Sequence, residues 1–259
     1  MKKLLLITTI LLSSFLILEG RHRHIFSRVS QQEGLTSTVN CICKEKDGDV
    51  WIGTPNGLYS FNGYTLKHYN IPIFKGSKVY HTSFDSNKNL WVLTNKCIAV
   101  KFADQNTFTK LEVPDSYTSG PFNSLAYGND CVWIGTVGRI YKYDYSAGRL
   151  TLFCTLPPKF DCKTMCMLDE NTILTCSREG KLKINTSNGK ICNATFGDIL
   201  EITATMMDSK ERVWMAFYNK GIQVFTKGGE LICSYNTQNS TLSNDIVLCL
   251  AEREGMILA

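Results

Sequence analysis

The stretch Asp47-Gly-Asp-Val-Trp-Ile-Gly-Thr54 decides the fold, because imperfect copies of it return along the chain. Its tryptophan, or an isoleucine in the same place, is the anchor of each copy, at Trp51, Trp91, Trp133, Ile173, Trp214 and Ile257. The steps between anchors are 40, 42, 40, 41 and 43 residues. All 4 tryptophans of the chain lie in this one column. A period near 41 residues predicts a repeat architecture.

The rest of the repeat predicts short strands. Eight residues before each anchor stands a small or apolar residue: Cys43, Ser83, Leu125, Met165, Met206 and Cys249. Glycine marks the turn after most anchor strands: Gly57, Gly138, Gly180 and Gly221. Alternating segments then follow at 58–61, 98–102, 140–143, 182–184 and 222–225, and again at 65–69, 108–113, 150–154, 191–196 and 231–235. Period-two patterning bounded by Gly, Asn and Asp is typical of strands.

Four short strands in about 41 residues form one blade of a β-propeller. We therefore expect an all-β chain with five blades and the start of a sixth over residues 26–259, and no helix after residue 20. A β-sandwich would not produce so regular a period. The last anchor, Ile257, is two residues from the end of the sequence. The sequence thus predicts an incomplete propeller with open sheet edges, from a fragment or a shortened reading frame.

Composition and charge exclude several classes of protein. The chain has 259 residues, of which 44% are apolar, 20% charged and 11% aromatic. These values are globular and exclude disorder and coiled coil. The formal net charge is +5, and Lys and Arg are scattered along the chain. No nucleic-acid partner is expected, because such binding needs a clustered basic face.

The 11 cysteines predict no metal or disulfide framework. The sequence contains no Cys-x-x-Cys pair, of the kind from which zinc sites are usually built. An odd number leaves at least one thiol free in any disulfide scheme. Cys43 and Cys249 stand in the apolar column before the anchors, so we expect most cysteines to be small core residues. No metal ion and no cofactor is expected.

The first 20 residues have the pattern of an export signal. Met1-Lys2-Lys3 is positively charged, and the uncharged, mostly apolar run 4–18 follows. Fifteen residues are short for a membrane span, which needs about 20, although a short uncleaved anchor is the alternative. No later segment is long and apolar enough to cross a membrane. We expect a signal peptide at 1–20 and a periplasmic body.

The residues Asp47–Gly63 resemble the two-component regulator propeller repeat, and so do the flanking segments 33–39 and 241–247. In that family the repeats form the periplasmic sensor of hybrid two-component histidine kinases, which are anchored in the inner membrane by a downstream span. The resemblance implies a sensor for an oligosaccharide or other small ligand, with the remainder of a dimeric kinase as partner. The sequence has no phospho-acceptor region, ATP-binding motif or receiver domain. We therefore expect no enzymatic activity in this chain, only in the full-length family.

Candidate ligand-binding residues follow from where propellers bind. Their ligands lie at one end of the central channel, on loops held by the rigid blades. Aromatic side chains beside Arg and Asn suit sugars, by stacking and by hydrogen bonds to hydroxyls. The candidates on these loops are Tyr80, His81, Arg139, Arg178, Tyr218 and Asn219. The four tryptophans are expected to be packing residues of the core.

Two other functions stay open. Streptogramin lyases also use a propeller of short repeats, with a histidine and a glutamate as acid and base. His81 and Glu179 are the residues that could take those roles. A passive protein-binding propeller is the third possibility, and it predicts a protein partner on the blade edges and no small ligand.

Overall fold

The computed structural model describes residues 34–35, 37–44, 48–114, 120–197 and 201–259. The chain divides into two compact units, Met1–Thr36 and Ser37–Ala259, and the fold below is that of the second unit. The expected signal peptide lies outside the described residues. Among the residues that are described, no helix has the length and apolar character that a membrane crossing requires.

Five four-stranded antiparallel sheets follow one another along the chain, and each is one blade. Blade 1 contains β1 (Cys41–Lys44), β2 (Val50–Thr54), β3 (Gly57–Phe61) and β4 (Leu66–His68). Blade 2 contains β5 (Val79–Phe84), β6 (Leu90–Thr94), β7 (Ile98–Lys101) and β8 (Thr109–Lys110). Blade 3 contains β9 (Phe122–Tyr127), β10 (Cys131–Thr136), β11 (Arg139–Asp144) and β12 (Arg149–Thr155). Blade 4 contains β13 (Thr164–Asp169), β14 (Thr172–Ser177), β15 (Gly180–Asn185) and β16 (Ile191–Asn193). Blade 5 contains β17 (Ile202–Met207), β18 (Val213–Phe217), β19 (Ile222–Phe225) and β20 (Leu231–Tyr235).

A two-stranded sheet of β21 (Ala251–Arg253) and β22 (Met256–Leu258) follows blade 5 and contains the sixth anchor. Within the described residues, the expectation of no helix after residue 20 is wrong at one place, the short 3₁₀ turn η2 (Pro72–Phe74). Proline begins this turn, where its fixed φ favours a helical start. So short a turn cannot be recognised from the alternation of apolar residues along the sequence.

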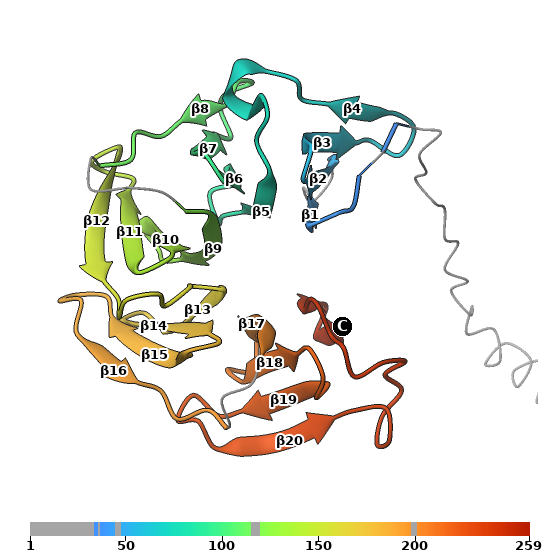
Figure 1. Cartoon of the computed structure of the whole chain (residues 1–259), viewed down its shortest axis with the longest axis vertical. Coiled ribbons are helices and arrows are strands. Elements are labelled where there is room, and N and C mark those ends of the chain that lie inside the picture. Colours follow the sequence, from blue (N-terminus) through green and yellow to red (C-terminus); the bar gives the residue numbers. More distant parts are fainter. Residues whose placement is uncertain (1–33, 36, 45–47, 115–119, 198–200) are drawn as a thin grey trace, which may run out of the picture. The chain divides into compact units, whose positions relative to one another are not determined.

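The first strands of the blades line the centre of the unit. Contacts join β1 to β5, β5 to β9, β9 to β13 and β13 to β17. Figure 1 shows these strands innermost, with the second, third and fourth strands of each blade lying progressively outward. This is the radial order of a β-propeller and confirms the predicted fold class.

The hydrophobic core lies between neighbouring blades. Trp91 of β6 packs with Val132 and Tyr143 of blade 3, and Trp133 of β10 packs with Met165 of blade 4. The anchor tryptophans are 0–6% exposed. The prediction that they are packing residues is therefore confirmed.

The glycine two residues after an anchor lets the next blade approach. A Cβ on Gly135 would lie 2.6 Å from Cys162 Cβ and 2.6 Å from Ser124 Oγ. A Cβ on Gly53 would lie 2.6 Å from Val79 Cγ1 of blade 2. Any larger residue at these two positions would push neighbouring blades apart.

A buried aspartate holds the anchor tryptophan in two of the blades. Asp85 Oδ2 accepts a hydrogen bond from Trp91 Nε1 at 2.7 Å, and Asp208 Oδ2 accepts one from Trp214 Nε1 at 2.8 Å. Each aspartate stands six residues before its tryptophan. The same aspartates accept backbone N–H groups of the turn between the first and second strands. One carboxylate thus ties the turn to the core.

Candidate functional site

We call front end the end of the blades where the first strand begins and the second strand turns into the third. In blade 2, Val79 pairs with Thr94 at this end, and Asn95 N–H donates to Lys78 O at 3.1 Å. The back end carries the turns between the first and second strands. All the predicted ligand-binding residues lie in front-end segments.

Bulges in the innermost strands aim side chains at the next blade. The pairing with the second strand skips Asn123 in β9 and Thr203 in β17. Asn123 Nδ2 donates to Asp161 Oδ1 of blade 4, and Thr203 Oγ1 donates to Val247 O at 2.5 Å. Bulges of this kind redirect a side chain that a regular strand would point elsewhere.

Arg178 and Tyr218 meet at Glu201, a residue that the sequence analysis did not single out. Arg178 Nη2 forms an ion pair with Glu201 Oε1, and Tyr218 N–H donates to Glu201 O at 3.0 Å. The side chains of Arg178 and Glu201 are 75% and 41% exposed. The pair therefore contributes little to stability and leaves donors and acceptors facing solvent.

A second polar group surrounds Asp161. Ser177 Oγ donates to Glu179 Oε2 at 2.6 Å, and this hydrogen bond holds the pKa of the Glu179 carboxyl below its usual range. The Glu179 carboxylate also accepts the backbone N–H of Asp161. Because Asn123 binds the other side of Asp161, these residues link the front ends of blades 3 and 4.

The other predicted residues lie on three segments: Tyr80 and His81 are neighbours in β5, Arg139 is in β11, and Asn219 follows Tyr218. Tyr80 occupies the bulge of β5 and is 37% exposed. His81 is half-buried, and burial lowers its pKa to about 4. Arg139 begins β11 and is half-buried, whereas Asn219 is exposed in the turn between β18 and β19. Of the predicted set, Arg178 and Tyr218 both contact Glu201, Arg178 through its side chain and Tyr218 through its backbone N–H.

The sequence gives only a weak indication of Asp161 and Glu201, which are not among the predicted ligand-binding residues. Asp161 and Glu201 are the acidic residues that directly precede the innermost-strand segments of blades 4 and 5. Their partners come from neighbouring blades or loops, so sequence spacing alone does not reveal them.

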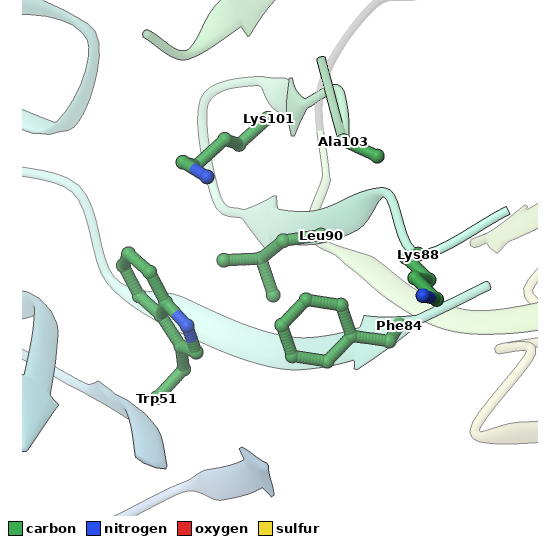
Figure 2. A pocket seen from close by; sticks show the side chains of 6 residues that line it. All are labelled: Trp51, Phe84, Lys88, Leu90, Lys101 and Ala103. Carbon is green, nitrogen blue, oxygen red and sulfur yellow. The ribbon is translucent and has the colours of Figure 1, made fainter. Parts of the chain in front are cut away.

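Two grooves lie between blades, away from the predicted residues. One, of about 80 Å³, lies between blades 1 and 2. Figure 2 shows Leu90 between the indole of Trp51 and the ring of Phe84, with Lys88 and Lys101 at the sides. The other, of about 390 Å³, lies between blades 3 and 4, next to Trp133.

The thiols are unpaired, and no group of potential metal ligands occurs in the described part of the chain. All eleven cysteines are free. Burial raises the pKa of Cys162 and of Cys166 to about 12. Among the described residues, no three His, Cys, Asp or Glu side chains gather as metal ligands.

Comparison with known proteins bears on the repeat. Residues 34–56 match the family model described as the two component regulator propeller. This match includes the first anchor, Trp51, and confirms the resemblance of the first blade to that repeat. No curated protein matches the chain.

Solved structures bear on the fold. The extracellular domain of BT4673 from B. thetaiotaomicron, described as part of a hybrid two component system, is 19% identical with a TM-score of 0.58, over 86% of this chain and 37% of that one. The extracellular domain of BT3049 from the same organism, described in the same way, is 14% identical with a TM-score of 0.63, over 87% and 39%. This chain thus spans less than half the length of these two relatives.

An enzyme shares the architecture as well. Virginiamycin B lyase from Staphylococcus aureus is 19% identical with a TM-score of 0.64, over 78% of this chain and 71% of that one. Identities this low establish the propeller fold and leave the activity to be argued from the residues of this chain.

Proposed function

We propose that this chain is the ligand-binding propeller of an exported two-component sensor. The observation that carries the proposal is the match of residues 34–56 to the two component regulator propeller. The likeness to extracellular domains of hybrid two component systems supports the same role. In this role the chain binds a ligand and performs no chemistry on it.

The proposed ligand is an oligosaccharide, bound at the front end of blades 4 and 5. Tyr218 is 44% exposed and offers a ring on which the apolar face of a sugar can pack. Glu201, whose carbonyl accepts the backbone N–H of Tyr218, and its partner Arg178 supply donors and acceptors, which suits hydroxyl groups that both donate and accept. Loops held by a rigid scaffold are where binding residues concentrate.

The proposed location is the periplasm, reached through a signal peptide at residues 1–20. The proposed partner is the remainder of a sensor kinase, which acts as a dimer and contributes the membrane span. Ligand binding can change the activity of the kinase only if the ligand favours one of two conformations of the receptor.

Calorimetric titration of the purified chain with neutral and acidic oligosaccharides tests the proposal. We expect saturable binding of one oligosaccharide class, weakened at least about tenfold in Arg178→Ala and in Tyr218→Ala, about 1.4 kcal/mol. Arg149→Ala is the control, because Arg149 is an exposed arginine on the outer strand β12. No binding by any sugar, or equal binding by both front-end variants and wild type, would overturn the proposal. Capture of a protein partner without sugar binding would favour the passive module.

A lyase is the second candidate, because virginiamycin B lyase has the same fold. The residues of this chain fit that chemistry poorly. His81 has a pKa of about 4, and the pKa of Glu179 is also lowered, so neither holds a proton near neutral pH that an acid catalyst could give. Quinupristin is the compound present in a solved structure of virginiamycin B lyase. If this chain converts quinupristin, as measured by chromatography, and His81→Ala abolishes the conversion, the chain is a lyase instead.

A further inference from the structure

The indole N–H of Trp133 is a buried donor without an acceptor. Trp133 is 2% exposed, and its Nε1 has no hydrogen-bond partner among the residues that the structure describes. The corresponding nitrogens of Trp91 and Trp214 donate to aspartates, whereas that of Trp51 also has no partner among the described residues. In blade 3 the residue six positions before the anchor is Tyr127, so this acceptor is missing. Because an indole nitrogen can only donate, a buried one without an acceptor calls for an explanation.

Trp133 lines a groove between blades 3 and 4. The groove has a volume of about 390 Å³, within the size range of small-molecule sites. It lies at the back end, because its lining includes Gly128 and Asp130 of the first turn in blade 3 and Glu170 of the corresponding turn in blade 4. It is therefore separate from the front-end residues of the proposed function.

Gly128 puts no side chain next to the buried indole nitrogen. A Cβ on Gly128 would lie 3.6 Å from Trp133 Nε1 and 3.1 Å from Cys131 Sγ. Gly128 and Cys131 both line the groove. The missing acceptor and the missing side chain thus fall at the same place.

The lining of the groove is acidic. Its carboxylates are Asp130, Asp169 and Glu170, and its one cation is Lys142. Lys142 Nζ lies 5.4 Å from the centre of the Trp133 ring and 3.7 Å from Asp144 Oδ2. Because Asp144 neutralises the charge of Lys142, the three lining carboxylates give the groove a net negative charge.

The groove between blades 1 and 2 has the opposite charge. Its charged lining residues are Lys88 and Lys101. Lys88 and Glu170 each stand three residues before an anchor, so the same repeat position carries a cation in one groove and a carboxylate in the other. A ligand that is selected by its positive charge should therefore bind in the acidic groove and not in the basic one.

We propose that the groove between blades 3 and 4 binds a small organic cation that carries hydroxyl groups, of the chemical class of amino sugars. Its ammonium group lies against the carboxylates of Asp130, Asp169 and Glu170. One of its hydroxyl oxygens accepts the hydrogen bond that Trp133 Nε1 offers. A carboxylate-lined groove attracts an ammonium ion, and the attraction is screened by salt. This site does not depend on the proposed sensor function.

Nitrogen-15 NMR of the four tryptophan indole groups tests the site directly. The probes are glucosamine, N-acetylglucosamine and glucose, because acetylation removes the charge of the amine and glucose lacks the amine. We expect glucosamine to shift the Trp133 indole signal saturably, and the two neutral sugars to bind at least about tenfold more weakly, about 1.4 kcal/mol. The signals of Trp91 and Trp214 remain in place, because aspartates hold their donors.

Substitutions that leave the core intact provide the second readout. The double variant Asp169→Asn, Glu170→Gln keeps side-chain shape and removes two charges, and it should weaken glucosamine binding at least tenfold. Asp104→Asn is the control, because Asp104 is an exposed carboxylate outside the groove. The indole signals of Trp91 and Trp214 report whether each variant is folded. An unshifted Trp133 signal, equal affinity for all three sugars, or unchanged affinity in the folded double variant would overturn the proposal.

Discussion

Replacing Asp208 by alanine tests whether one buried carboxylate holds both the turn and the tryptophan of blade 5. The Asp208 side chain is 1% exposed. Its Oδ2 accepts Trp214 Nε1 at 2.8 Å and Arg212 Nε at 2.7 Å. Its Oδ1 accepts the backbone N–H groups of Lys210 at 3.0 Å and Arg212 at 2.8 Å. The substitution removes the acceptor of all four donors at once.

The expected loss of stability follows from which donors can reach water. The indole N–H belongs to Trp214, which is 6% exposed, and a buried donor without a partner costs about 1–3 kcal/mol. The backbone N–H of Arg212 is partly buried and adds a smaller amount, whereas the guanidinium is hydrated. We expect Asp208→Ala to lower the free energy of unfolding by about 3 kcal/mol. The midpoint of thermal unfolding should fall by about 6–12 °C in a domain of this size.

The loss should also depend on pH. Burial by itself raises the pKa of Asp208, but the backbone N–H of Arg212, the indole of Trp214 and the Arg212 guanidinium together bring it below its ordinary value. A carboxyl whose pKa is lowered on folding stabilises the folded state above its unfolded-state pKa of about 4. That stabilisation disappears as the pH falls through the folded-state pKa. The difference between wild type and variant should therefore shrink below about pH 4.

Urea unfolding followed by tryptophan fluorescence measures the effect at pH 7 and pH 3. Glu211→Gln is the matched control, because Glu211 lies in the same turn and forms an exposed ion pair with Lys227. Its loss should cost no more than about 1 kcal/mol. If Asp208→Ala unfolds at the same urea concentration as the control, the carboxylate does not support the core and the reasoning is wrong.

Three further outcomes are expected. Gly135→Ala should destabilise by about 1–3 kcal/mol in urea unfolding, because its Cβ would lie 2.6 Å from Cys162 Cβ. The folded-state pKa of His81 is about 4, below the ordinary 6.5, so stability should fall by about 3 kcal/mol as the pH drops from 6.5 to 4, and His81→Gln should remove this dependence. With a thiol reagent at pH 8, the exposed Cys192 and Cys249 should react first in the folded protein.

Each of these outcomes has a control within the chain. Gly228→Ala should be nearly neutral, because the nearest atom to its added Cβ would be Thr226 Oγ1 at 3.4 Å. His68→Gln should leave the pH dependence in place, since His68 is exposed. Rapid labelling of Cys162 in the folded protein, before Cys192, would contradict the burial of the inner strands.

The architecture could be predicted from the sequence because one physical requirement recurs in every repeat. Each pair of neighbouring blades needs large apolar side chains between them, and the anchors Trp51 to Ile257 supply these at a constant period. Strand type follows from local alternation. The small residues Gly53 and Gly135 are also visible in the sequence, but the reason for them lies in the next blade.

The candidate site could be predicted only in part, since its partners come from different blades. Arg178 and Tyr218 lie on front-end turns, as expected, but the residue that both contact is Glu201, which directly precedes the innermost strand β17. Asp161 binds Asn123 because a bulge redirects the Asn123 side chain. A bulge depends on how two strands meet, and the spacing of residues along one strand does not reveal it.

The tryptophan column shows how a repeat separates the packing of a side chain from its hydrogen bonding. The indole rings of Trp91, Trp133 and Trp214 are all buried, at most 6% exposed, and fill equivalent places between blades. What differs is the residue six positions earlier, which is an aspartate in blades 2 and 5 and Tyr127 in blade 3. Packing sets the position of the ring, and this neighbour decides whether its N–H is used internally. A difference at this one position can therefore leave a buried indole N–H without an acceptor while the ring keeps its place between the blades.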